Sequence, residues 1–314
     1  MKKIVYLLII VILLVWIGLS LFKISNEGQP EISAIKVSKQ ENFLKEIKII
    51  FVGDIMLDRH IRKMMAIHGE DQPFICFDSL LQSADLVVGN LEGPITNNKS
   101  ISLGSIVDTP ENYVFTFSTS TANLLYKHNI RLVNLGNNHI SNFSDSGIKQ
   151  TKFYLEQARV NYFGGLAGDN RVFKTTINGT NLSFINYNQF GGDSIDSVTN
   201  LIRQEKSIGN TVIVYTHWGE EYIEATQKTR NIAKIFAEAG ADLIVGTHPH
   251  VIQESEVIDK TIVYYSLGNF IFDQYFRPEV KTGLILIVTF KGSQFKVEEQ
   301  KVTLNKDGQT CLLY

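Results

Sequence analysis

Cysteine is almost absent from this chain, which has two among its 314 residues, Cys76 and Cys311. A disulfide-rich scaffold and a zinc site built from thiolates both need more cysteines, so neither class is expected. We expect the two cysteines to be reduced residues that pack in the interior, with a single bridge between them as the alternative.

An excess of either charge is also lacking, since 30 Lys and Arg residues face 32 Asp and Glu residues, a net charge of -2. Nucleic-acid-binding domains usually carry a basic stripe with interleaved aromatic residues, so nucleic acid is not an expected partner. Hydrophobic residues make up 44% of the chain, which is typical of a folded globular protein. No long linker or internal repeat follows the first 45 residues, which predicts one domain over 46–314.

The first residues differ from the rest, because Ile4–Phe22 is an almost unbroken apolar run. A helix of about 20 apolar residues crosses the ~30 Å hydrocarbon core of a membrane. A cleaved signal peptide, the alternative, has a shorter apolar region and a small-residue cleavage site, and no such site follows here. We therefore expect an uncleaved anchor over 1–24 and a polar stalk over 25–45. Lys2 and Lys3 favour a cytoplasmic N-terminus, with the main domain outside the cytoplasmic membrane.

Short runs rich in Val and Ile recur along the remaining chain, and each ends in turn-forming residues. We interpret these runs as buried strands. In open α/β folds, ligands bind where the carboxyl ends of the strands meet. Oxygen and nitrogen side chains without cysteine suit metal ions such as Zn, Mn or Fe. The candidates at these strand ends are Asp54, Asn90, Glu92, Asn138, His139, His217, His248 and His250.

Helices are expected between the strands. Gly240 is a natural terminator for the last of them. Alternating strands and helices predict a layered α/β architecture, and the apolar segments after residue 282 predict antiparallel edge strands. The expected helices are 58–68, 118–128, 146–158, 198–206 and 226–239.

Two histidines on either side of a proline, His248 and His250, are the strongest local signal. In an extended segment residues i and i+2 point the same way, so both rings can face one pocket. A lone histidine usually packs in a core, but this pair directly follows a strand, which favours metal ligands. His217 also lies directly beyond a strand. Glu220 or Glu221 could hold its second nitrogen, or the two could be a solvated pair.

The amide of Asn138 precedes the imidazole of His139, and Asp145 follows six residues later. Asparagine is an unusual metal ligand and is common in turns and helix caps, so both interpretations of Asn138 stay open. Asp145 could cap a helix or orient His139, and the sequence does not separate these roles.

Taken in order, the motifs from Ile47 to Phe290 resemble the poly-γ-glutamate capsule biosynthesis (CapA-type) family, a branch of the calcineurin-like metallophosphoesterase superfamily. That resemblance implies a metallophosphoesterase-like four-layer α/β/β/α sandwich preceded by an N-terminal transmembrane helix. The motifs that carry it are GDIMLDR at 53–59, NLEGP at 90–94, NNH at 137–139 followed by Asp145 and Gly147, HWGEEY at 217–222, HPHVIQ at 248–253 and YSLGNFIFDQ at 265–274.

The resemblance also implies roles for the strand-end residues. It implies one or two divalent metal ions, and it makes His139, with Asp145 nearby, the catalytic candidate. Met56 stands where the wider superfamily has a first-strand histidine, so one imidazole ligand is missing. The implied metal ligands are Asp54, either Asn90 or Glu92, Asn138, His217, His248 and His250.

Three functions fit these features. The first is a membrane-anchored extracytoplasmic protein of poly-γ-glutamate capsule biosynthesis or export, with a metal-dependent hydrolase-type site and membrane synthase or export subunits as partners. The second is a non-catalytic subunit of the same machinery that binds the anionic polymer. The third is a metallophosphoesterase that acts on nucleotides or envelope phosphates.

Overall fold

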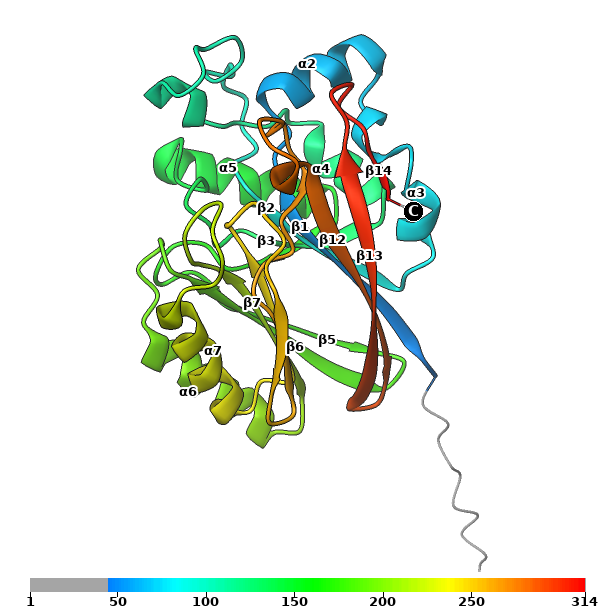
Figure 1. The fold of residues 1–314 in the computed structure, drawn as a ribbon, viewed down its shortest axis with the longest axis vertical. Helices are drawn as coiled ribbons and strands as arrows, with labels where there is room; N and C mark the ends of the chain where they lie inside the picture. Colours follow the sequence, from blue (N-terminus) through cyan, green and yellow to red (C-terminus); the bar gives the residue numbers. More distant parts are fainter. Residues whose placement is uncertain (1–44, 314) are drawn as a thin grey trace, which may run out of the picture. The chain divides into compact units, whose positions relative to one another are not determined.

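Two β-sheets form the centre of residues 45–313, the part of the chain that the computed structural model describes (Figure 1). The first sheet has the order β14-β13-β12-β1-β2-β3-β4, with β11 beside β1, and the second has the order β5-β6-β7-β8-β10-β9. The strands are β1 (Ile47–Ile55), β2 (Leu86–Leu91), β3 (Ile130–Asn134), β4 (Asn161–Phe163), β5 (Val172–Ile177), β6 (Thr180–Asn188), β7 (Thr211–His217), β8 (Leu243–Thr247), β9 (Ser255–Ile258), β10 (Thr261–Tyr264), β11 (Asn269–Ile271), β12 (Thr282–Lys291), β13 (Gln294–Leu304) and β14 (Thr310–Leu312).

Alternation along the strands explains why both faces of each sheet are covered. Ile50 and Val52 of β1 belong to an apolar cluster shared with helices. Ile49 and Phe51 belong to a second cluster, which also contains residues of β6, β7 and β8. Because successive side chains of a strand point to opposite faces, β1 packs on helices with one face and on the second sheet with the other.

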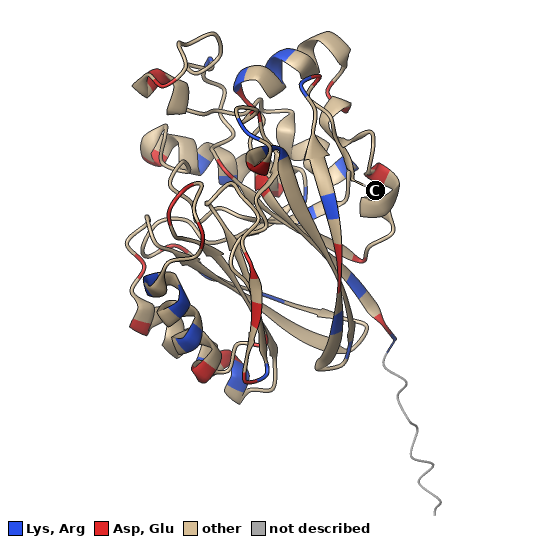
Figure 2. Ribbon diagram, in the orientation of Figure 1, with Lys and Arg blue, Asp and Glu red and all other residues tan. Residues whose placement is uncertain are grey.

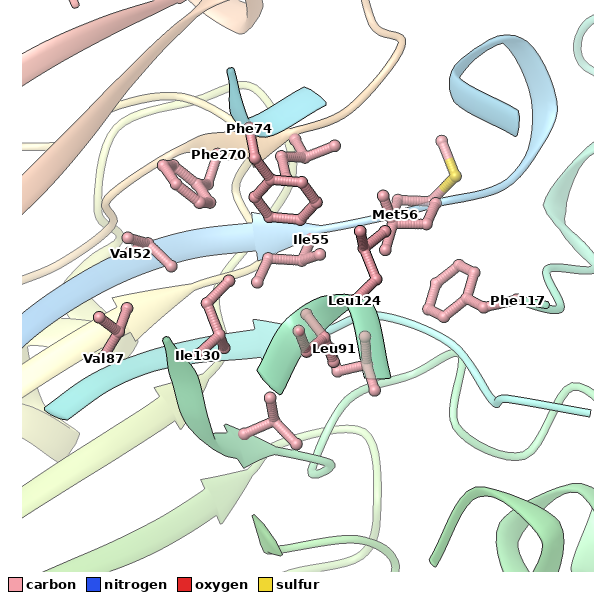
Figure 3. Close-up of a cluster of buried hydrophobic side chains, with 14 of the residues drawn as sticks. Val52, Ile55, Met56, Phe74, Val87, Leu91, Phe117, Leu124, Ile130 and Phe270 are labelled. Atoms are coloured by element: carbon pink, nitrogen blue, oxygen red, sulfur yellow. The ribbon is translucent and has the colours of Figure 1, made fainter. Parts of the chain in front are cut away.

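The helices cover the outer faces of the two sheets (Figure 1). In Figure 3, Phe74 and Leu124 lie among side chains of β1 and β2, including Val52 and Val87. A third cluster joins α6 and α7 to the outer face of the second sheet. Charged side chains of both signs are interspersed over α6 and α7, in keeping with the near-neutral composition (Figure 2). The helices are α2 (Arg59–His68), α3 (Asp78–Gln82), α4 (Thr121–Lys127), α5 (Ser144–Gln157), α6 (Ile195–Ser207) and α7 (Gln227–Ala239), with 3₁₀ turns η1 (Gln72–Phe74), η2 (Pro110–Tyr113) and η3 (Glu279–Lys281).

Two glycines allow neighbouring segments to approach closely at the strand ends. A Cβ at Gly53 would lie 1.9 Å from the carbonyl oxygen of Gly268, and one at Gly246 would lie 1.9 Å from that of Tyr265. Only a residue without a side chain fits at such distances. The segment before β11 therefore rests directly on the ends of β1 and β8.

The prediction of a two-sheet α/β sandwich is confirmed, and so are the five expected helices and the antiparallel strands after residue 282. Helix α7 ends at Gly240, which has the left-handed φ of 109° expected of a terminator. Strands β4, β5, β6 and β9 and the short helix α3 were not predicted. The expected anchor, and the expected stalk up to residue 44, lie outside the described residues. Within residues 45–313, no helix has the length and apolarity that crossing a membrane requires.

The expectation of two reduced cysteines is wrong, because Cys76 and Cys311 form a disulfide with their Cα atoms 4.8 Å apart. The two residues are separated by 235 positions in the sequence. Strand β14 pairs with β13, with Cys311 opposite Thr303, and this pairing brings the end of the chain beside the segment that follows η1. Only the sheet topology makes the two cysteines neighbours.

We expect the double variant Cys76→Ser/Cys311→Ser to lower the free energy of unfolding by about 2–4 kcal/mol, because the bridge restricts the unfolded chain. Denaturant unfolding with and without reductant measures this difference. Wild type should lose stability in reductant and the double variant should not. Equal unfolding midpoints for wild type in both buffers would contradict the bridge.

Candidate functional site

Polar side chains from both sheets meet at the carboxyl ends of their strands. In the first sheet, Asp54 pairs in register with Asn90 and with Asn269. In the second sheet, His217 pairs in register with Asn188 and Thr247. All of these residues are buried. The sequence prediction that strand ends gather these groups is therefore correct in its geometry.

Two buried carboxylates, Asp54 and Glu92, occupy the centre of this cluster. Burial opposes the charge of Asp54, but hydrogen bonds from His250 and from the amide of Asn90 outweigh it and lower the pKa of Asp54. The Asn90 Nδ2 donates to Asp54 Oδ1 at 2.8 Å, and the backbone N–H of His248 donates to Oδ2 at 3.2 Å. Burial, followed by the negative charge of Asp54, raises the pKa of Glu92 well above its usual range. A cation between them would relieve this repulsion.

Asn90 and Glu92 were alternatives for the ligand supplied by the second strand, and their hydrogen bonds differ. Asn90 Oδ1 accepts from the amides of Asn134 and Asn137 at 3.1 and 3.2 Å, while its Nδ2 faces Asp54. The amide oxygen of Asn90 is thus already occupied. Glu92 Oε1 is buried and has no hydrogen-bond partner among the described residues. Glu92 is therefore the better placed of the two to bind a cation.

The ring of His250 has one nitrogen free for a ligand. Asn269 Nδ2 donates to the carbonyl of Val280 and to Gln274 Oε1, each at 3.0 Å, which fixes Asn269 Oδ1 as the acceptor. That oxygen lies 2.9 Å from His250 Nδ1, so Nδ1 carries the proton. The lone pair of Nε2 remains, 3.6 Å from Glu92 Oε1.

His139 has the same arrangement. Asn142 Oδ1 accepts the backbone N–H of Phe115 at 2.8 Å and lies 3.2 Å from His139 Nδ1, which assigns the proton to Nδ1. His139 Nε2 lies 3.9 Å from Glu92 Oε1. Burial lowers the pKa of His139 to about 4, so the ring is neutral at neutral pH. Asp145 does not join this group: it is exposed in the first turn of α5, and the contact expected of it is made by Asn142.

Both ring nitrogens of His217 have polar neighbours. Nδ1 lies 3.0 Å from the hydroxyl of Thr247 and 3.3 Å from Asn90 Nδ2. Nε2 lies 3.0 Å from Asn138 Oδ1. The ring therefore contacts residues of both sheets. Burial, and then the charge of nearby His248, lower the pKa of His217 well below its usual range.

The two histidines of the His-Pro-His segment reach the site by a route that the sequence did not predict. His248 and His250 have φ angles of 98° and 57°, so the segment is left-handed at both positions and not extended. Left-handed backbone is strained for residues other than glycine and clusters at functional sites. The two rings still lie in the same pocket, with centroids 5.9 Å apart.

Neither Glu220 nor Glu221 holds His217, since both nitrogens of that ring contact other residues. The alternative of a solvated pair agrees with their exposure. Met56, which stands where an imidazole was missing, is buried and accepts the backbone N–H of Asp58 at its sulfur. The first strand thus supplies Asp54 to the site but no imidazole of its own.

Several site residues were missed in the sequence. Asn186 and Asn188 end β6, a strand that was not predicted, and Asn269 belongs to the SLGNF segment, for which no site role was predicted. The available signal was the same as elsewhere: an amide at the end of an apolar run. Arg59 and Tyr222 line a cavity of about 330 Å³ beside the cluster. The Tyr222 ring centroid lies 6.0 Å from that of His250, so the cavity adjoins the buried site.

The donor set fits a divalent cation. Ligand atoms of Asp54, Glu92 and His250 lie within 4.8 Å of one another, and all three residues are buried. Buried polar atoms normally have partners, yet Glu92 Oε1 and His248 Nδ1 have none within residues 45–313. Carboxylate, amide and imidazole ligands suit Zn, Mn or Fe.

Comparison with known proteins gives a consistent result. The model of the family described as "Bacterial capsule synthesis protein PGA_cap" matches residues 48–274. The PGA biosynthesis protein CapA of Bacillus subtilis (strain 168) is 28% identical over 243 residues, which are 71% of this chain and 63% of that protein. The capsule biosynthesis protein CapA of Bacillus anthracis is 29% identical over 274 residues, 79% of this chain and 65% of that protein. The chain thus spans less than two thirds of the length of these relatives.

A solved structure has a related fold. It is described as the crystal structure of a novel phosphatase from Mycoplasma pneumoniae, and it aligns with a TM-score of 0.50 at 15% identity, covering 83% of this chain and 94% of the other. At this identity the likeness concerns the fold alone.

Asn269 yields a test of the proton assignment on His250. We expect Asn269→Ala to weaken the binding of Mn²⁺ or Zn²⁺ by about 10–100-fold, the usual effect of losing a partner that orients a ligand. Asn269→Asp keeps an acceptor for the Nδ1 proton and should bind the metal more tightly than the alanine variant. Both variants lose the Nδ2 donor, so calorimetric titration of the pair isolates the acceptor. Equal affinities for the two variants would contradict the assignment.

Proposed function

The chain belongs to the bacterial capsule synthesis protein family, and we propose that it is a membrane-anchored extracytoplasmic protein of poly-γ-glutamate capsule biosynthesis or export with a metal-dependent hydrolase-type site. The family resemblance drawn from the sequence motifs is confirmed. The two relatives are named for PGA or capsule biosynthesis, which supports the capsule polymer as the substrate.

One observation carries the hydrolase proposal. Glu92 Oε1 lies 3.6 Å from His250 Nε2 and 3.9 Å from His139 Nε2, and both imidazoles carry their proton on the other nitrogen. These three atoms therefore converge in a buried site with no hydrogen bond between them. Such an arrangement is unfavourable in a buried site unless a cation or a substrate group enters it. The residues that would hold a cation are Asp54, Glu92, Asn138, His217, His248 and His250.

A divalent cation in this site supplies Lewis-acid activation of water and of the bond under attack. His139 is neutral and has a bare Nε2, so it can accept a proton from the attacking water and then return it to the leaving group. The ring is held by Asn142 and by Phe115, whose ring centroid lies 4.3 Å from that of His139. The ring places its Nε2 beside Glu92.

The adjoining cavity is lined by the cationic Arg59 and Lys63 beside the acidic Asp108 and Asp273. Arg59 lines it and is paired with Asp273, with its guanidinium 4.9 Å above the ring of Phe115. Tyr222 connects the cavity to His250. A cation beside a metal centre favours carboxylate or phosphate groups. Poly-γ-glutamate presents carboxylates along an amide-linked chain, and a phosphoester presents the same charge at its reacting group.

The disulfide supports the proposed location. Disulfides persist in oxidising compartments and are rare in the cytosol. A bond between Cys76 and Cys311 therefore agrees with a domain outside the cytoplasmic membrane. Ile4–Phe22 remains the proposed anchor, with membrane synthase or export subunits as proposed partners.

We expect His139→Ala to keep most of its metal but to lose about 10²–10⁴-fold in hydrolysis, the usual contribution of a general acid or base. Asp54→Asn should lose both metal and activity. Metal content by mass spectrometry, measured beside turnover of poly-γ-glutamate and of a phosphoester, tests both statements. Turnover of poly-γ-glutamate would indicate a polymer hydrolase, and turnover of the phosphoester alone would indicate a phosphoesterase.

His68→Ala is the matched control, because His68 is exposed at the end of α2. It should retain wild-type metal content and turnover. Normal capsule production in cells that carry His139→Ala would sink the catalytic proposal and favour a polymer-binding role.

We expect the full chain to fractionate with membranes and to keep its N-terminus, because Ile4–Phe22 is long enough to span the bilayer. Removal of residues 1–25 should release the protein into the soluble fraction. N-terminal sequencing of the mature protein decides the matter, and a start beyond Phe22 would rule out an uncleaved anchor.

A further inference from the structure

Tyr222 fixes the loop that follows β7 against the His-Pro-His turn. Its backbone N–H donates to the carbonyl of Pro249 at 2.8 Å. Its own carbonyl accepts from Arg277 at 2.7 Å, and its hydroxyl accepts from Gln274 at 2.9 Å. The residue before it, Glu221, is therefore held beside the two histidines of the turn.

The side chain of Glu221 belongs to a cluster with metal-binding character. Its carboxylate and one ring nitrogen each of His248 and His250 lie within 4.8 Å of one another. His248 is only 5% exposed, and its Nδ1 has no hydrogen-bond partner in the part of the chain that the structure describes. Glu221 itself is exposed, so it borders this cluster on the solvent side.

We propose that Glu221 is a carboxylate ligand that completes the metal site from the solvent side. The inference rests on the proposed metal-dependent function and adds a residue to it. The buried side of the site already holds Asp54 and Glu92, and β1 adds no imidazole because the Met56 sulfur is turned to the backbone of Asp58. Glu221 would then supply a further ligand from the loop after β7.

The neighbouring Glu220 makes the assignment specific. Both glutamates are exposed and carry the same charge, so they contribute similarly to the general attraction of a cation. Only Glu221 belongs to the cluster with His248 and His250. A difference in metal affinity between Glu221→Gln and Glu220→Gln thus measures coordination and not net charge.

The test uses the full chain purified in detergent, stripped of metal and titrated with Mn²⁺. We expect Glu221→Gln to weaken Mn²⁺ binding by at least about tenfold, or to remove one bound ion, since loss of even an outer partner costs about 10–100-fold. Glu220→Gln should stay within about twofold of wild type. With Co²⁺ bound, Glu221→Gln should also shift the visible absorption bands, which report the ligands of the ion.

Unfolding of both variants in chelator controls for the fold, and equal midpoints are expected because both side chains are exposed. Wild-type affinity and an unchanged Co²⁺ spectrum in Glu221→Gln, beside loss of metal in His250→Ala, would overturn the role of Glu221 and leave the proposed function standing. Equal weakening in the two glutamine variants would also overturn it. A wild-type protein that binds neither Mn²⁺ nor Co²⁺ would overturn the proposed function as well.

Discussion

The rest of the site depends on the burial of two carboxylates, Asp54 and Glu92, at the edge of one sheet. An ionised carboxylate removed from water is unfavourable unless hydrogen bonds or an opposite charge compensate it. The described residues compensate Asp54 with an amide, a backbone N–H and His250. They leave one oxygen of Glu92 without a partner, and that oxygen faces His139 and His250. The imbalance between the two carboxylates is the feature on which the proposed cation site rests.

Asparagine amides organise this imbalance. Asn186 donates to Asn134 Oδ1 at 2.8 Å, Asn134 donates to Asn90 Oδ1 at 3.1 Å, and Asn90 donates to Asp54 at 2.8 Å. The series runs from the second sheet to the first with every donor pointing toward the carboxylate. Hydrogen bonds in such a series polarise one another in a low-dielectric interior. Because each amide has a fixed donor end and acceptor end, the network also orients the groups around it without adding charge.

The strand ends were predictable because their signal is local. A run of Val and Ile followed by a polar residue led to Asp54, Glu92 and His217, and their meeting follows from parallel strands. The β6 strand escaped because Asn and Ser interrupt its apolar residues, so Asn186 was missed with it. The Cys76–Cys311 bond was only the alternative to two reduced cysteines, since it depends on how β14 pairs with β13.

The left-handed backbone at His248 and His250 could not be read from the sequence either, and it bears on what the site is for. Such a conformation costs about 1–3 kcal/mol at each residue and persists where the surrounding structure enforces it. The left-handed Tyr222, fixed to Pro249, is part of that enforcement. A subunit that only bound polymer on its surface would gain nothing from strained imidazoles beside a buried, unpartnered carboxylate oxygen. A cation that binds only the folded state offsets both costs, so the same features that weaken the metal-free fold argue for a metal-dependent site.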